Sequence, residues 1–331
     1  MEVKNLHRGA GPGRFAAYAW FVTGLTLAVI LWGAFVRASK SGDGCGAHWP
    51  LCNGTVVPDA SQSKTLVEFA HRATSGVAFL LVVALCVWAF RRFGRGHAVR
   101  AGAAASGLFI VTESLIGAGL VLLRLVGDNA SVARAVYLSV HLVNTFLLAA
   151  ALALTAWWAS VGASARPRLA AFVRGRAGAA LLGSLALGVS GAVAALGATL
   201  FSEAAGEAAP LEGMSAASRL LFSLRHYKLH PLLAVAVGGY LVYYALASRR
   251  GGGGVWARRW SSAVLALVAA QFAAGLLNAA LLAPVWLQLV HLLLADLLWL
   301  ALVLLAAVCL TRDEARAGEF GRVGLGAVVK V

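Results

Sequence analysis

Eight long apolar stretches constrain this chain more than any other feature of its sequence. A helix that crosses a lipid bilayer needs about 20 mainly apolar residues, and each stretch reaches that length. Of the 331 residues, 60% are hydrophobic and 12% are charged, whereas a soluble domain carries about 25% charged residues. The sequence therefore predicts an all-α polytopic membrane protein and excludes a soluble or disordered one. The predicted spans are residues 15–37, 66–90, 101–123, 133–158, 178–201, 226–247, 261–282 and 286–310.

The basic residues predict the orientation of the chain in the membrane. The 28 Lys and Arg residues exceed the 13 Asp and Glu residues and give a net charge of +15. Nineteen of the basic residues fall in the two terminal segments and the second, fourth and sixth connections. Basic residues concentrate on the cytoplasmic side of membrane proteins. We therefore expect the N- and C-termini to lie in the cytoplasm. The positive net charge then reflects the orientation of the chain in the membrane, and we expect no nucleic-acid partner.

The histidines indicate an internal repeat of four helices. Four of the eight lie a few residues inside the outer end of an even-numbered span. The spacing between the first and third is 159 residues, and that between the second and fourth is 150. Similar offsets predict two pseudo-symmetric four-helix bundles, residues 1–165 and 166–331. The four histidines are His71, His141, His230 and His291.

Their depth in the membrane predicts a ligand role. Imidazole inside hydrocarbon is costly without a partner, so such residues are functional candidates. Heme iron takes axial nitrogens from facing helices of a bundle, so each half can hold one heme between two histidines. Zinc is disfavoured because a tetrahedral site needs four close ligands. Hydrogen bonds to neighbouring helices remain the structural alternative.

Three acidic residues fall within the predicted spans. Glu68 stands three residues before His71, so both project from one helical face. A carboxylate there can accept or deliver protons beside a macrocycle, and its structural alternative is an ion pair with Arg72. The sequence leaves open whether Glu113 and Asp296 relay protons or are satisfied core acids.

Two cysteines bear on the compartment of the first outer loop. Cys45 and Cys52 bracket six residues that include His48. Outside a bacterial or archaeal cell membrane, where disulfides persist, a bridge between them is the favoured interpretation. Two free thiols, or a metal site that includes His48, are the alternatives.

Taken together, these motifs resemble the heme A synthases of cytochrome oxidase assembly. The resemblance covers nearly the whole chain, and its most specific part joins the outer-loop cysteine motif to the glutamate and histidine motif. It implies eight helices in two bundles and oxidation of the C8 methyl of heme O to a formyl group, with water supplying the oxygen. The motifs are Ser41-Gly42-Asp43-Gly44-Cys45, Trp49-Pro50-Leu51-Cys52-Asn53-Gly54, Glu68-Phe69-Ala70-His71-Arg72, His141-Leu142-Val143-Asn144-Thr145, His230-Pro231-Leu232-Leu233-Ala234 and Gln288-Leu289-Val290-His291.

The resemblance also implies roles for individual residues. His71 and His141 would flank the substrate, heme O, with Glu68 as the catalytic carboxylate beside the methyl group. His230 and His291 would hold a permanent heme b. Some members carry a second cysteine pair in the long outer loop, whereas residues 202–225 here contain none.

The expected partners are heme O synthase, an electron acceptor and the lipid bilayer, with a homo-oligomer left open. Three arginines near outer helix ends can pair with heme propionates. The alternative is that these side chains snorkel, that is, extend to the membrane surface without contacting heme. These are Arg37, Arg72 and Arg225.

Two other functions would keep the four histidines. One is a non-catalytic heme carrier or oxidase assembly factor, and the other is a diheme protein that passes electrons from quinol. Neither requires Glu68 beside His71, so this carboxylate separates the enzyme from both alternatives.

Overall fold

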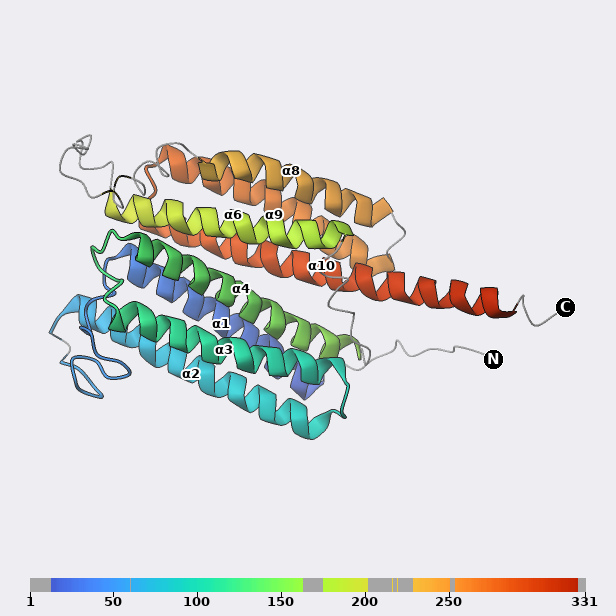
Figure 1. The fold of residues 1–331 in the computed structure, drawn as a ribbon, viewed down its shortest axis with the longest axis horizontal. Helices are drawn as coiled ribbons and strands as arrows, with labels where there is room; N and C mark the ends of the chain where they lie inside the picture. The colour runs from blue at the N-terminus through green and yellow to red at the C-terminus, as the bar shows by residue number, and fades with distance from the viewer. Residues whose placement is uncertain are drawn as a thin grey trace.

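The structure is a computed structural model in which long helices run side by side along one axis (Figure 1). It describes residues 13–59, 61–162, 175–201, 216, 219, 229–250 and 254–326, with side chains up to residue 310. Within those residues no β-strand forms, and eight helices are long and apolar enough to cross a membrane. The predicted all-α chain with eight spanning helices is confirmed.

The helix bounds agree with the hydropathy pattern and extend beyond it at several ends. The first four helices are α1 (Arg14–Ala38), α2 (Ser63–Arg92), α3 (Ala98–Leu122) and α4 (Val132–Val161). The other four are α6 (Gly175–Leu200), α8 (Leu229–Arg250), α9 (Gly254–Ala280) and α10 (Val285–Gly326). Helix α9 begins before its apolar stretch because a helix can continue through the polar interface with Arg258 and Arg259 on its first turns.

The helices contact one another in two rings of four (Figure 1). In the first ring α1 touches α2, α2 touches α3, α3 touches α4 and α4 returns to α1. In the second ring α6, α8, α9 and α10 follow the same order. The rings meet where α4 contacts α6 and α10, and where α1 contacts α10. Helices α4 and α10 are accordingly the most buried spans.

One aromatic contact holds α4 and α10 together at the junction of the rings. The indole nitrogen of Trp299 donates to the Phe146 carbonyl oxygen at 2.7 Å. The two side chains also stack, with their ring centroids 5.2 Å apart. A buried indole needs a hydrogen-bond acceptor as well as apolar contacts, and this pair supplies both.

Small residues let α3 and α4 approach closely. A Cβ added to Gly102 would collide with the Thr155 hydroxyl oxygen, so only glycine fits there. Small residues at helix contacts are the usual means of close packing inside a membrane, where the hydrophobic effect does not drive helices together. The close approach brings polar side chains of α3 within reach of α4.

Charged side chains order the connection between α3 and α4. Arg134 is 3% exposed and donates to the carbonyl oxygens of Gly127 and Asn129 at 2.6 and 2.9 Å. At the surface, Lys40 lies 2.7 Å from Asp128, and this hydrogen bond lowers the pKa of the Asp128 carboxyl group. The pair is exposed, so its small contribution to stability is present at neutral pH and disappears as acid protonates the carboxylate.

Candidate functional site

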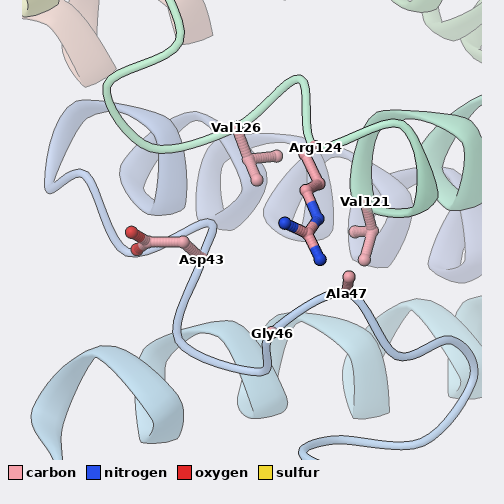
Figure 2. A pocket seen from close by; sticks show the side chains of 6 residues that line it. All are labelled: Asp43, Gly46, Ala47, Val121, Arg124 and Val126. Atoms are coloured by element: carbon pink, nitrogen blue, oxygen red, sulfur yellow. The ribbon is translucent and has the colours of Figure 1, made fainter.

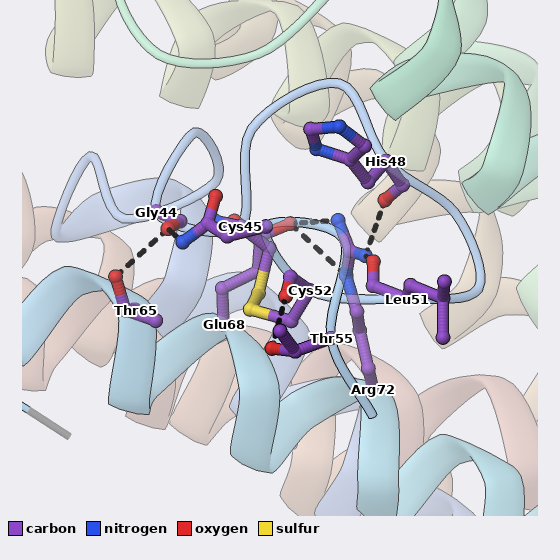
Figure 3. Close-up of a disulfide and its surroundings, with 10 residues drawn as sticks. Gly44, Cys45, His48, Leu51, Cys52, Thr55, Thr65, Glu68 and Arg72 are labelled. Carbon is purple, nitrogen blue, oxygen red and sulfur yellow. Dashed lines mark hydrogen bonds and ion pairs between the residues drawn. A yellow bond between two sulfur atoms is a disulfide. The ribbon is translucent and has the colours of Figure 1, made fainter. Parts of the chain in front are cut away.

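A disulfide closes the loop between α1 and α2, the disulfide loop (Figure 3). It joins Cys45 and Cys52, whose Cα atoms lie 4.4 Å apart, and both cysteines are buried. The predicted disulfide is confirmed. Neither cysteine is left as a thiol for the metal site with His48 that the sequence left open.

The disulfide loop rests directly on the first turns of α2. A Cβ on Gly44 would lie 2.5 Å from the backbone carbonyl carbon of Lys64, which requires glycine at this crossing. The Thr65 hydroxyl donates to the Gly44 carbonyl oxygen at 2.8 Å. The loop is therefore fixed to the helix that carries Glu68 and His71.

Glu68 lies beneath this loop with both carboxylate oxygens engaged (Figure 3). Its exposure is 3%, and its Oε2 accepts a hydrogen bond from the Cys45 backbone N–H at 2.8 Å. Its Oε1 accepts from Arg72 Nη2 at 2.6 Å and from Arg72 Nε at 3.2 Å. The ion pair considered as the structural alternative is thus present, and the catalytic role of Glu68 stays a prediction.

Arg72 ties the same loop to the helix from the other side. Its Nη1 donates to the carbonyl oxygens of His48 and Leu51, each at 2.6 Å. Both carbonyls belong to the segment that the disulfide closes. The guanidinium group is therefore committed to Glu68 and the loop, and contact with a heme propionate would require it to exchange partners.

Arg37, in the last turn of α1, links the two rings of helices. From α1, its Nη1 donates to the Ala195 carbonyl oxygen at 2.9 Å and to the Thr199 hydroxyl oxygen at 2.6 Å. Its Nη2 donates to the Gln288 side-chain oxygen at 3.1 Å. Its propionate role remains a prediction, and Arg225 lies outside the described residues.

The disulfide predicts a simple chemical result. In protein isolated and denatured without reductant, Cys45 and Cys52 should resist alkylation, whereas the α2 thiol of Cys86, which is not in a disulfide, should react. After reduction both loop cysteines should gain the label. Mass spectrometry of the loop peptide measures this, and labelling of Cys45 and Cys52 before reduction would contradict the bridge.

The first ring of helices carries His71 on α2 and His141 on α4. Helices α2 and α4 each contact both α1 and α3, so the two histidines lie on opposite helices of the ring. A Cβ on Gly33 of α1 would lie 2.9 Å from His71 Cε1, so this glycine makes room for the ring. On the far side of the pair, His141 Nδ1 lies 3.6 Å from a carboxylate oxygen of Glu113 on α3.

The second ring carries His230 on α8 and His291 on α10, which face each other. Their ring centroids lie 6.5 Å apart and their planes are at 85°. Glycines again adjoin the rings, because a Cβ on Gly191 or Gly275 would lie 3.0 or 3.1 Å from Cε1 of His230 or His291. The Ser190 hydroxyl lies 2.9 Å from His230 Nδ1, which leaves Nε2 of that ring for another partner.

The separation of this second pair is close to that of two imidazoles that would hold one iron ion, and in this structure His291 Nε2 lies 3.3 Å from Gln271 Nε2. A metal–nitrogen bond is about 2 Å long and each nitrogen lies about 1 Å from its ring centre, so two opposed ligands place their centroids about 6 Å apart. The donor chemistry also fits: in the described part of the chain, Nδ1 of His71, His141 and His291 is buried without a hydrogen-bond partner. Each of these three nitrogens therefore remains available to another partner.

Three polar neighbours of the histidines were not identified from the sequence. They are Ser190 beside His230, Gln271 beside His291 and Glu113 beside His141. A signal for two of them was available, because Gln271 follows Glu113 by 158 residues and Gly191 follows Gly33 by the same interval. The spacing of the histidines alone does not reveal these two pairs.

Asp296 on α10 keeps no assigned role. It is 1% exposed, and its Oδ2 has no hydrogen-bond partner among the side chains and backbone that the structure describes. Its position five residues after His291 places it on a different helical face, since neighbours on one face are three or four residues apart.

A cavity of about 310 Å³ opens between the disulfide loop and the α3–α4 connection (Figure 2). Arg124 and Val126 line it from one side and Asp43 from the other. Neither Glu68 nor any of the four histidines contributes to its lining. This cavity therefore lies beside the predicted chemistry and is not its centre.

Comparison with known proteins gives two kinds of relative. A curated protein from Thermus thermophilus, named protoheme IX farnesyltransferase, is 50% identical over 317 residues. That match covers 94% of this chain but 51% of the relative, so the chain spans about half the length of this relative. Proteins named heme A synthase match shorter parts: 32% identity over 131 residues in Exiguobacterium sibiricum and 42% over 105 residues in Geobacillus kaustophilus. These cover 40% and 31% of this chain, and 43% and 33% of the relatives.

The family comparison spans nearly the whole membrane region. A family described as cytochrome oxidase assembly protein, COX15-CtaA, matches residues 16–303. The match begins in α1 and ends in α10, so it includes both rings of helices, the disulfide loop and all four histidines. The chain therefore belongs to the cytochrome oxidase assembly protein family.

Proposed function

We propose that this chain is a heme A synthase that oxidises the C8 methyl of heme O to a formyl group. The observation that carries the proposal is the buried carboxylate of Glu68, three residues before His71 on the same helix. A protein that only carries heme needs ligands, whereas a methyl oxidation also needs a group that takes up protons. The heme A synthase relatives and the oxidase assembly family support this choice.

In this proposal the second ring of helices holds a resident heme b. His230 and His291 would bind it, with Ser190 orienting His230 through Nδ1. A heme bound there would accept electrons and pass them on one at a time. The protein itself supplies the two imidazoles and the apolar surroundings that exclude water.

The first ring would bind the substrate heme O between His71 and His141. Converting the methyl to a formyl group adds an oxygen atom from water and releases electron pairs and protons. In this proposal Glu68 would take those protons at a carboxylate oxygen; the donor to its Oε2 among the described residues is the Cys45 N–H. The electrons must leave to an acceptor, which we assign to the resident heme and then to an outside partner.

The Thermus relatives are named farnesyltransferases. We take this name as support for a farnesyltransferase partner of this chain, and not as support for farnesyl transfer by the chain itself. Those proteins are about twice as long as the matched segment, and this chain, which aligns with that segment, belongs to the oxidase assembly family. We place the farnesyl transfer in their remaining half. Joining the two functions in one polypeptide would deliver a farnesylated heme from one site to the next, so we propose a heme O synthase as partner here.

The test is heme analysis of cells that lack their own heme A and produce this chain together with a heme O synthase. Extraction and chromatography should show heme A that is absent when either protein is omitted. Heme O without heme A would favour the carrier. A purified protein that contains two b hemes and reacts with quinol, without making heme A, would favour the diheme electron-transfer alternative.

Two glycines on α1 allow a test of how closely His71 is packed in the proposed first heme site. Gly33→Ala adds a methyl group 2.9 Å from His71 Cε1, so the imidazole must move. Gly24→Ala on the same helix meets nothing within 4 Å and is the matched control. Both changes favour the helix by about 0.5–1 kcal/mol. Only Gly33→Ala should speed heme loss, by about 10–100-fold as expected for displaced ligands, measured by transfer to a heme-scavenging protein.

A further inference from the structure

We propose that Glu113 is a positioning residue for His141, and that Gln271 takes the corresponding place beside His291. The inference rests on the proposed function, because both histidines are predicted to hold heme. It assigns a role to a carboxylate that the sequence left undecided, and it distinguishes the chemistry of the two heme sites.

The Glu113 carboxylate is held rigidly by two side chains of α4. Its Oε2 accepts from the Asn144 amide at 2.6 Å, and its Oε1 accepts from the Thr145 hydroxyl at 2.5 Å. The Asn144 side-chain oxygen in turn accepts from the Thr112 hydroxyl at 2.6 Å. These donors follow His141 by three and four residues, so they fix the carboxylate on the same face of α4 as the imidazole.

The fixed carboxylate faces a ring nitrogen that lacks a partner. Glu113 Oε2 lies 3.6 Å from His141 Nδ1, and no hydrogen bond to that buried nitrogen exists among the described residues. A hydrogen bond between nitrogen and oxygen spans about 2.7–3.2 Å, so a movement of about half an ångström completes it. With Nδ1 directed at the carboxylate, Nε2 is the nitrogen that remains for iron.

The second ring of helices places an amide where the first places a carboxylate. Gln271 lies on α9, the third helix of its ring, as Glu113 lies on α3. Its Nε2 is 3.3 Å from His291 Nε2. The nitrogen near the polar side chain is Nε2 in His291 and Nδ1 in His141. A half-turn of the His291 imidazole about its Cβ–Cγ bond exchanges its two nitrogens. The shared feature is the polar side chain on the third helix.

The difference in charge between these side chains has a direct electrochemical consequence. A carboxylate that accepts from the second nitrogen of a ligating imidazole makes the ligand more basic, and an uncharged amide does so less. A more basic axial ligand stabilises oxidised iron, because hydrogen bonding and charge near the ligand set the reduction potential. Glu113 would therefore keep the heme held by His141 at a lower potential than an amide would.

The experiment uses a crossed pair of variants, Glu113→Gln and Gln271→Glu, in the full-length protein purified from cells that also produce a heme O synthase, so that heme is supplied to both sites. Redox titration followed by optical and electron paramagnetic resonance spectra resolves the two hemes. Glu113→Gln should raise the potential of one heme and increase its rate of loss to a scavenging protein by about 10–100-fold. Gln271→Glu should lower the potential of the other heme. Glu113→Asp, which keeps the charge, should restore the potential.

Ser114→Ala is the matched control on α3, since that hydroxyl bonds to Ile110 within its own helix. It should change neither potential. The inference is overturned if Glu113→Gln leaves both potentials and loss rates unchanged, or if it moves both hemes alike, as a general weakening of the fold would. These results are separable from failure of the proposed function, which would appear in the unmodified protein as absence of heme A.

Discussion

Cells that produce Glu68→Gln together with a heme O synthase should accumulate heme O or a hydroxylated intermediate in place of heme A. The substitution keeps the side chain's shape and an oxygen that can accept the Cys45 N–H. It removes the group proposed to take up protons, and loss of one well-placed general base typically costs about 10²–10⁴-fold in rate. Chromatography of extracted hemes measures the result, and an unchanged yield of heme A would contradict the catalytic role.

The structure supplies the control that this experiment needs, because Glu68 also pairs with Arg72. Removing one member of a buried ion pair costs about 3–5 kcal/mol when its partner stays unpaired, so Glu68→Gln can also act by loosening the disulfide loop. Arg72→Gln breaks the same pair but keeps the carboxylate. If heme A synthesis falls as far in Arg72→Gln as in Glu68→Gln, loop position explains the loss. If Arg72→Gln retains most of the heme A synthesis, the loss in Glu68→Gln is explained by the missing proton transfer.

Hydropathy predicted the eight spans because the bilayer imposes them. A segment inside hydrocarbon must satisfy its own backbone hydrogen bonds, so an apolar stretch of sufficient length has few alternatives to a helix. The same physics allowed the four histidines to be identified, since imidazole inside a span is costly and therefore rare. The disulfide followed from two cysteines within one short outer loop.

Which face of each helix points inward could not be predicted in the same way. Lipid-facing and buried surfaces are both apolar, so the sequence of a span carries little information about its rotation. On α3, for example, Leu115 is 61% exposed and Leu120 is 8% exposed. The contact between Glu113 and His141 depends on that rotation. The sequence therefore showed an acid without a local partner, although the partner lies on the next helix.

The surroundings of Glu68 were unpredictable for a different reason. Its spacing from His71 and Arg72 can be seen directly in the sequence, because the three residues are neighbours on one helix. Its hydrogen bond from the Cys45 N–H joins residues that are 23 positions apart. That contact depends on how the disulfide loop folds back onto α2, where Gly44 permits the approach to Lys64. Loop geometry of this kind is set by tertiary contacts and leaves only a weak trace in the motif.

Substitution of either histidine in the second ring should have the largest effect on bound cofactor. His230→Ala or His291→Ala removes one of the two imidazoles proposed to bind heme b, whose centroids lie 6.5 Å apart, so this heme should lose its low-spin spectrum and dissociate on purification. Ser190→Ala leaves both ligands and removes only the hydroxyl beside His230 Nδ1. It should weaken binding by about 10–100-fold, in keeping with a residue that orients a ligand.

His48→Ala is the matched control for these variants. His48 lies in the disulfide loop, and it accepts a hydrogen bond from Arg72 at its backbone carbonyl oxygen, which alanine retains. Its heme content and absorption spectrum should equal those of the unmodified protein. If His230→Ala and His291→Ala also keep full heme b with an unchanged spectrum, the second ring does not hold the heme through these histidines. In that case His226, which precedes His230 by four residues in the sequence and lies outside the described residues, becomes the next ligand to replace.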